Sequence, residues 1–382
     1  MKKLKARKTS YYNSVYILHH NLKYIKVYMK PILLIWPASL IISVSIALIA
    51  LHTSCNHTIS NKEHNEVRLG KLLFYSRALS ANNTKSCASC HDPKYAFTDG
   101  YKRSIGVYGD LHQRNSKPLF NLQQQHYFTA GDSTIHSILT QMDRPLYNQH
   151  PPELGLLQGS THTIMHIQQD TAISKAYTQL YHKPITSLTM SQVKQAIATY
   201  ILTLTSYNTR YDAYIQGHTT ALDSNEKAGL ALYNSTITNC ASCHGGSNFN
   251  TPTVHNKYGN TLYYFNTGLY NVDGAGSYPI TDQGLYNTTK QPKDKGAFAV
   301  PTLRNLYYTA PYYHDGSAST LSQVIHNYNL GGRNITQGLH AGNGVASPYK
   351  HASIKPLGLS VQDEANLVAF LLTLTDSTIV SK

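Results

Sequence analysis

Acidic residues are scarce in this 382-residue sequence. Asp and Glu number 19 against 33 Lys and Arg, which gives a formal net charge of +14 at pH 7. Eight of the basic residues lie within the first 30 positions, where there is no acid at all. From Cys55 onward, 25 basic residues face 19 acidic ones, a balance of only +6. A body this mildly basic excludes a protein that binds nucleic acid through a strongly charged surface.

Tryptophan, methionine and charged residues in general are also rare. The single Trp is Trp36, and the last of the five Met is Met190, so the C-terminal half offers no thioether ligand to a metal. Charged residues make up 14% of the chain, too few for a disordered protein, and the 41% hydrophobic content is enough for sizeable cores. The length predicts two or three domains.

Residues 1–54 have the layout of a targeting segment. Pro31–Leu51 is an uncharged stretch of 21 residues, long enough to span a bilayer. Because basic residues precede it, the positive-inside rule predicts a cytoplasmic N-terminus and export of the rest. Starting at Met29, the segment is instead typical of a signal peptide that ends at a lipid-modified Cys55, although the Leu is one position too far from Cys55 for a good lipoprotein motif. We expect either a membrane anchor or a signal peptide over 1–54.

Four of the five cysteines lie in two identical CASCH pentapeptides. Two thiols three positions apart can each form a thioether with a haem vinyl group, and the following His then ligates the iron. A shared zinc site would leave both histidines without a role, and thioredoxin-like chemistry needs no His after its CxxC. The repeat predicts two covalently bound haem c groups, one held by Cys87, Cys90 and His91 and the other by Cys240, Cys243 and His244.

The sequence around the two motifs is a tandem repeat. Short amphipathic helices ending in Gly70–Phe74 and Gly229–Tyr233 precede the motifs, and longer ones over 191–205 and 360–375 follow them, each beginning at a Ser that can cap a helix. No stretch alternates strongly enough to suggest a sheet. We predict a mainly α fold with two tandem cytochrome c-like helical domains, over 60–215 and 216–382, each enclosing one haem behind the N-terminal segment.

Two further strings connect this pattern with a known family. Val300–Leu306 (VPTLRNL) and Thr309–Gly316 (TAPYYHDG) follow the second CASCH motif and precede Thr320–Gly332. Together with the motifs, they resemble the bacterial dihaem cytochrome c peroxidase family, which includes MauG, over residues 66–376. The resemblance implies an exported enzyme on the periplasmic side of a bacterial inner membrane. His91 would ligate the peroxide haem, and His244 would ligate the haem that passes electrons to it.

The resemblance also implies a distal pair of side chains at the peroxide haem. The family has a Gln, a Pro four residues later and then a Glu, which map onto Gln141, Pro145 and Glu153, with a two-residue insertion before the Glu. Cleavage of the peroxide O–O bond requires a proton to leave one oxygen and reach the other. A carboxylate can carry this proton, and an amide can orient the peroxide.

The sixth ligand of the second haem separates the subfamilies. Typical peroxidases have a Met fourteen residues after the His of the HDG string, and MauG has a Tyr there. Counting from His314 gives Tyr328, an anionic oxygen donor that favours ferric iron. His326 or an open coordination site are the alternatives to Tyr328.

This sequence departs from the family at two positions. The usual Trp between the haems is absent, so Tyr127 or Phe128 is expected to carry electrons, with Tyr127 favoured because phenol oxidises more readily. Enzymes that need reductive activation have a displaceable His at the position of Val107, which predicts a peroxide haem that is already open. His112 lies nearby but out of register, as expected for a surface loop residue.

Two smaller assignments follow from the same resemblance. The family binds one calcium ion between its domains, and its ligands map onto Asn115, Thr309 and Pro311, the latter two through backbone carbonyls. Arg304 of the PTLRN string is expected to pair with a haem propionate.

The resulting hypotheses differ in what the haems do. The first is a peroxidase that reduces hydrogen peroxide to water with electrons from a small cytochrome c or cupredoxin. The second is a MauG-like oxidase that acts on a protein or organic substrate through high-valent iron. The third is a non-catalytic dihaem electron carrier. The family often forms homodimers, but no residue of this sequence indicates one.

Overall fold

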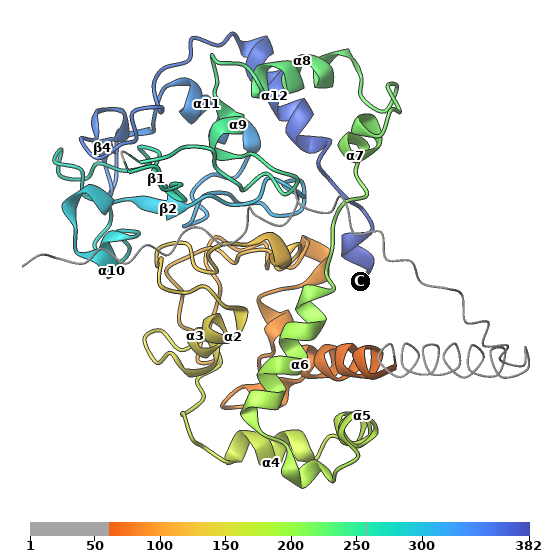
Figure 1. The fold of residues 1–382 in the computed structure, drawn as a ribbon. Helices are drawn as coiled ribbons and strands as arrows, with labels where there is room; N and C mark the ends of the chain where they lie inside the picture. The colour runs from red at the N-terminus through yellow and green to blue at the C-terminus, as the bar shows by residue number, and fades with distance from the viewer. Residues whose placement is uncertain (1–60, 257) are drawn as a thin grey trace, which may run out of the picture. The chain divides into compact units, whose positions relative to one another are not determined.

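The computed structural model describes residues 61–256 and 258–382, so the predicted targeting segment lies outside the described part. A helix covers residues 61–75. The helices that follow are α2 (Ile138–Gln141), α3 (Asp143–Tyr147), α4 (His162–Gln168), α5 (Thr171–Tyr181), α6 (Met190–Leu202), α7 (Arg210–Ile215), α8 (Ser224–Tyr233), α9 (Cys240–Cys243), α10 (Tyr286–Thr289), α11 (Leu321–Asn329) and α12 (Val361–Leu372). The protein is mainly helical, as predicted (Figure 1).

The strands form two small antiparallel sheets that the sequence did not predict. β1 (Tyr264–Asn266) pairs with β2 (Ala297–Ala299), and β3 (Asn334–Ile335) pairs with β4 (Gly342–Asn343). Strands of two or three residues are too short to produce a detectable alternation of apolar and polar side chains. They join loops of the second half of the chain and do not extend into a larger sheet.

The first half of the described chain has its core where the helix over 61–75 crosses α6. Leu69, Leu73 and Phe74 are fully buried there. A Cβ atom at Gly70 would lie 1.9 Å from the carbonyl oxygen of Ala196, so only glycine permits the two helices to approach this closely. The N-terminus of α6 is capped by Thr189 in a capping box, and not by Ser191 as expected.

The second half repeats this arrangement. α8 packs against α12, and a Cβ atom at Gly229 would lie 1.9 Å from the carbonyl oxygen of Asn366. The predicted cap of α12 is confirmed, because Ser360 forms a capping box with Asp363. Equivalent glycine crossings at Gly70 and Gly229 place the two CASCH motifs after equivalent helices. The exact division of the chain at residue 215 stays a prediction.

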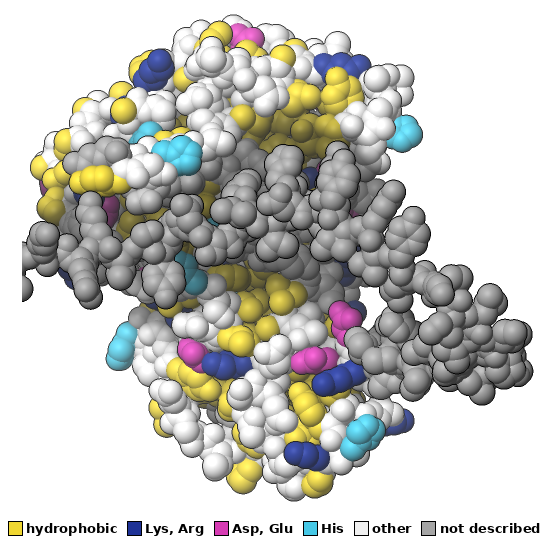
Figure 2. All heavy atoms as spheres, in the orientation of Figure 1, with side chains coloured by type: hydrophobic (Ala, Val, Ile, Leu, Met, Phe, Trp, Pro, Cys, Tyr) yellow, Lys and Arg dark blue, Asp and Glu magenta, His cyan; other side chains and the backbone are white. Residues whose placement is uncertain are grey.

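Outside the cores, one face of the molecule has a mixed surface. Figure 2 shows Lys and Arg side chains scattered over that face, some of them beside Asp or Glu side chains. No helix of the described chain is both long and apolar enough to cross a bilayer.

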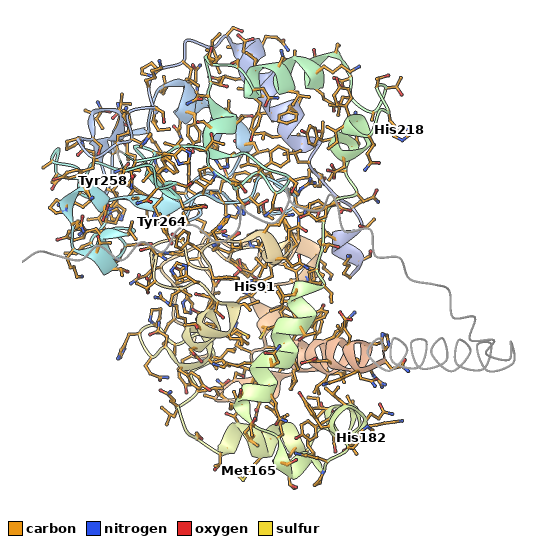
Figure 3. The ribbon with its side chains drawn as sticks, viewed as in Figure 1. His91, Met165, His182, His218, Tyr258 and Tyr264 are labelled. Carbon is orange, nitrogen blue, oxygen red and sulfur yellow. The ribbon has the colours of Figure 1, made fainter. Side chains whose placement is uncertain are left out.

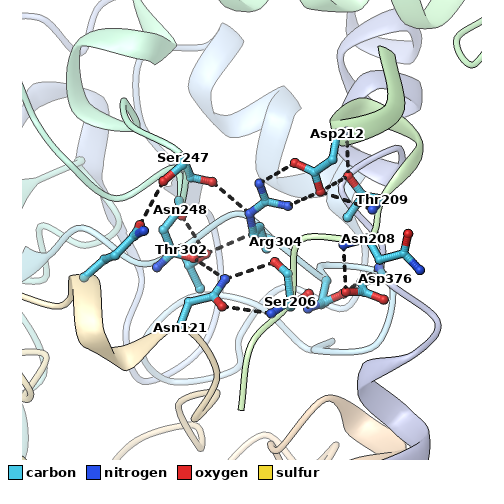
Figure 4. A network of polar contacts seen from close by, with 12 residues as sticks. Asn121, Ser206, Asn208, Thr209, Asp212, Ser247, Asn248, Thr302, Arg304 and Asp376 are labelled. Carbon is cyan, nitrogen blue, oxygen red and sulfur yellow. Dashed lines mark hydrogen bonds and ion pairs between the residues drawn. The ribbon is translucent and has the colours of Figure 1, made fainter. Parts of the chain in front are cut away.

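A buried polar network joins the two halves (Figure 4). Arg304 is 2% exposed, and its guanidinium donates to both carboxylate oxygens of Asp212, at 2.7 and 2.8 Å. In the same network, Asn121 of the first half donates to Asn248 Oδ1 at 3.0 Å and to Ser206 O at 3.1 Å. The segment between α6 and α7 is therefore held by side chains from both halves.

The C-terminal residues return to the first half. Ile379 is fully buried in the core that contains Leu73 and Phe74. Lys71 donates to the backbone oxygen of Lys382 at 2.9 Å. The two halves are therefore connected by the chain end as well as by the polar network.

Asp212→Asn should destabilise the protein strongly, since the substitution leaves the Arg304 guanidinium buried without a counter-charge. Loss of one partner of a buried pair costs about 3–5 kcal/mol. Asp143→Asn is the matched control, because Asp143 is 46% exposed in its pair with Lys194 and such pairs contribute about 0–1 kcal/mol. Urea unfolding of both variants measures the difference. Equal losses would contradict the assignment of the network as a structural joint.

Candidate active site

Both CASCH motifs face one cavity of about 1140 Å³. The two cysteines and the histidine of each motif line its wall, so segments 150 residues apart share one internal space. His91 lies in the interior of the described unit (Figure 3). The volume exceeds the ~300–1,000 Å³ of ordinary small-molecule pockets. The cavity can therefore contain more than one small cofactor.

The two motif histidines are oriented in the same way. His91 Nδ1 is 3.0 Å from Phe97 O, and His244 Nδ1 is 3.1 Å from Phe249 O. A carbonyl acceptor requires the proton on Nδ1, which leaves Nε2 as a lone-pair donor. Burial lowers the pKa of both histidines and keeps them neutral. This is the arrangement that an axial iron ligand needs, so both motifs fit a haem.

None of the four motif cysteines forms a disulfide with another cysteine of the described chain. Burial raises the pKa of Cys87 to about 12 and that of Cys90 to about 11. A redox-active CxxC needs a lowered thiol pKa, so these surroundings do not suit disulfide exchange. Among the described residues, no three His, Cys, Asp or Glu side chains are grouped to hold a metal ion. Thioether formation remains the chemistry that the first motif suits.

Gln141 and Glu153 line the cavity, and Glu153 is close enough to the first motif for its charge to add to burial in raising the pKa values of Cys87 and Cys90. Gln141 ends α2, and its Oε1 is buried without a hydrogen-bond partner, so it is available to a molecule in the cavity. Leu154 N donates to Pro145 O at 2.9 Å, which folds the Glu153 loop back onto α3. Burial raises the pKa of Glu153 to about 7, and the charge of Arg144 opposes this rise. A carboxyl group with this pKa can both accept and donate a proton at neutral pH.

The loop before Asn115 also holds the backbone of Glu153, in addition to the contact with α3. Val107 N donates to Glu153 O at 2.9 Å, and Asn82 Nδ2 donates to Val107 O at 3.0 Å. Val107 is 5% exposed and does not line the cavity. The expectation of a surface position for His112 is wrong, because His112 is 9% exposed and its Nδ1 lies 3.9 Å from Glu153 Oε1. A turn between Val107 and His112 places it there, which its spacing from Asn115 did not reveal.

Tyr328 lines the cavity near the second motif, on α11. Burial raises its pKa far above the usual value, and the nearby Tyr313, Cys243 and Cys240 act in the same direction. The alternative ligand His326 has a side chain that is 58% exposed and pairs with Glu364, at 3.1 Å. The geometry therefore favours Tyr328 over His326 as the side chain that can reach a group in the cavity.

Arg304 does not line the cavity, which corrects the expectation that it pairs with a propionate. Its Nε donates to Ser247 O at 2.8 Å, and its two terminal nitrogens bind Asp212. Lys117 lines the cavity instead, two residues after Asn115. Burial lowers the pKa of Lys117 to about 8, and the charge of Arg114 acts in the same direction. Sequence reasoning missed Lys117 because no motif contains it.

Tyr127 and Phe128 point to different surroundings. The Tyr127 ring packs 5.1 Å from the rings of Tyr263 and Tyr264 and 5.0 Å from that of His136. Phe128 lines the cavity, and Tyr127 does not. Of these two side chains, Phe128 is therefore the one that lines the cavity shared by the motifs.

The three predicted calcium ligands line the same cavity. Asn115 Nδ2 donates to Tyr101 O at 2.7 Å, which leaves its Oδ1 free to face a cation. Asn115 N also donates to His314 O at 2.7 Å. This hydrogen bond ties Asn115 to the TAPYYHDG segment, which contains Thr309 and Pro311. Neutral amide and carbonyl oxygens are donors that suit calcium.

Comparison with known proteins agrees with this geometry. A family model described as di-haem cytochrome c peroxidase matches residues 64–220. Cytochrome-c peroxidase IdrP2 of Denitromonas iodatirespirans is 31% identical over 324 residues, which cover 81% of each chain. The methylamine utilization protein MauG of Methylorubrum extorquens is 27% identical over 315 residues, covering 81% of this chain and 78% of MauG. The crystal structure of a MauG-like protein associated with microbial copper homeostasis superposes with a TM-score of 0.77 at 36% identity, over 83% of this chain and 91% of that one.

The fold and the site define the class of this protein: it is mainly helical, and two haem-binding motifs line one cavity. The chain belongs to the dihaem cytochrome c peroxidase family. It is therefore an oxidoreductase of a haem peroxidase family whose members carry two haems.

Proposed function

We propose that this protein reduces hydrogen peroxide to water at a haem bound by Cys87, Cys90 and His91. Electrons enter through a second haem, bound by Cys240, Cys243 and His244, from a small cytochrome c or cupredoxin. The observation that carries this proposal is the single cavity that both motifs line together with Gln141 and Glu153, where Glu153 lies close enough to act on the charge of Cys87 and Cys90. When bound, the first haem supplies the iron that takes up peroxide and the electrons that cleave its O–O bond.

The side chains of the first site supply the protons and hold the substrate. The Gln141 amide, whose Oε1 has no partner in the described chain, orients the peroxide. The Glu153 carboxylate accepts the proton from one peroxide oxygen and returns it to the other. Its pKa of about 7 suits both steps, because the group exchanges protons readily near neutral pH. His112, 3.9 Å away, limits the movement of the Glu153 side chain.

A MauG-like oxidase is the second candidate function, and Tyr328 is the observation that favours it. A phenolate ligand to the second haem would lower its potential and ease access to high oxidation states. The likeness to the MauG-like structure supports the same candidate. Such an enzyme would oxidise a protein or organic substrate instead of a reduced cytochrome.

We further propose that Asn115, Thr309 and Pro311 bind a calcium ion, with Thr309 and Pro311 acting through their carbonyls. Electrons would pass between the haems through Phe128 or the Tyr127 cluster. Residues 1–54 would export the protein to the periplasmic side of the inner membrane, as an anchor or a signal peptide, and residues 60–215 and 216–382 would each enclose one haem.

Glu153→Gln tests the proposed function most directly. The amide keeps the shape of the side chain but cannot take up the proton, so turnover of peroxide with a reduced small cytochrome c should fall by about 10²–10⁴. Glu63→Gln, an exposed residue of the first helix, is the control and should retain full turnover. Full activity of Glu153→Gln would remove Glu153 from the mechanism, and an inactive wild type would leave the oxidase as the better candidate.

The pH dependence of turnover should follow the Glu153 carboxyl. Its raised pKa means that the ionised, proton-accepting form is lost as the pH falls through about 7. We expect kcat/KM for peroxide to decline below pH 7 in the wild type. The residual activity of Glu153→Gln should not decline in this pH range. A decline at the same pH in the variant would assign the titration to another group.

Tyr328→Phe should change the ferric absorption and EPR spectra of one haem and leave the other unaltered. Tyr312→Phe is the matched control, since Tyr312 also lines the cavity but donates its hydroxyl to Leu306 O at 2.8 Å. Identical spectra for Tyr328→Phe and the wild type would exclude phenolate ligation.

A further inference from the structure

Lys117 is a lysine on the cavity wall that has no carboxylate partner among the described residues. Its ammonium makes one hydrogen bond in the described chain, to Phe128 O at the long distance of 3.4 Å. An ammonium group has three donors, and a site this poorly matched leaves most of its charge uncompensated. The surroundings therefore lack an anion at the position that Lys117 faces.

The other cationic side chains that line the cavity can be compared with Lys117 by the partners they have. Arg114 binds Asp282 through two hydrogen bonds of 2.6 and 2.8 Å, and Arg144 binds Asp132. Both guanidinium groups are thus neutralised by the chain itself. Lys85 also lines the cavity, directly before the first motif. Lys85 and Lys117 are therefore the two cavity-lining cations that remain available to a ligand.

The backbone around Lys117 is fixed against the first CASCH motif. Ser116 Oγ donates to Cys90 O at 2.5 Å and lies 3.3 Å from His91 Nδ1. Asn115 N donates to His314 O at 2.7 Å on the other side. Because the two residues before it are held, the Lys117 side chain begins at a defined point beside His91 and extends toward Phe128.

We propose that the Lys117 ammonium binds a propionate of the haem attached at Cys87 and Cys90. A carboxylate is the anion that this haem would bring into the cavity, and Arg304, the guanidinium expected in this role, does not line the cavity and is paired with Asp212. Pairing would give Lys117 its missing counter-charge and would hold the propionate near Phe128. The inference rests on the proposed attachment of haem to the first motif.

Lys117→Met in the holoenzyme tests this assignment without any use of peroxide. Removal of the cation leaves the propionate charge uncompensated, and a negative charge near the iron stabilises the ferric form. We expect the reduction equilibrium constant of the first haem to fall by about tenfold, which is 59 mV for one electron. Its propionate-bending band in the resonance Raman spectrum should shift as well. Spectroelectrochemistry, with the two haems distinguished by EPR, measures the first effect.

Two matched variants separate pairing from general electrostatics. Lys117→Arg should keep both the reduction equilibrium constant and the propionate band close to those of the wild type. Lys85→Met removes the same charge from the same cavity wall and should change the reduction equilibrium constant less than threefold. An unchanged potential in Lys117→Met, or a larger shift in Lys85→Met, would overturn the assignment. A pyridine haemochrome count of two haems per chain in each variant checks attachment separately, so a failure of the proposed haem site is distinguishable from a failure of the Lys117 pair.

Discussion

The buried pair of Arg304 and Asp212 is the interaction on which the placement of the two haem-binding motifs depends. A guanidinium group that is almost inaccessible to water is tolerable only when its donors are satisfied, and Asp212 and Ser247 satisfy them. Asp212 also caps α7, so the same carboxylate fixes the connection between the halves. Asn121 extends the joint into the first half through Asn248 and Ser206. The cavity between the motifs is therefore rigidly framed.

Identical pentapeptides lie in different surroundings within this frame. Glu153 lies near the cysteines of the first CASCH motif, and Tyr328 lies near those of the second. Since both histidines present Nε2 in the same way, any difference in chemistry comes from the opposite wall of the cavity. Under the proposed function, this difference would assign proton transfer to the first site and electron transfer to the second.

Much of this organisation could be predicted from the sequence, because the relevant signals are local. The CASCH motifs and the Ser360 cap each depend on residues within one turn or one helix. The partners of Arg304 could not be predicted, since Asp212 is 92 positions away and no spacing rule connects them. The positions of His112 and Lys117 could not be predicted for the same reason, because their places on the cavity wall depend on loops whose course only the tertiary structure reveals.

The most direct test of this account concerns the resting state of the first site. Val107 is held by Glu153 O and Asn82 and does not line the cavity, so this position of the chain supplies no displaceable ligand. The fully oxidised, haem-loaded protein should be mixed with one equivalent of hydrogen peroxide in a stopped-flow spectrometer. The account predicts an immediate change in the haem spectrum without prior reduction. A spectrum that stays unchanged until one haem has been reduced would contradict it.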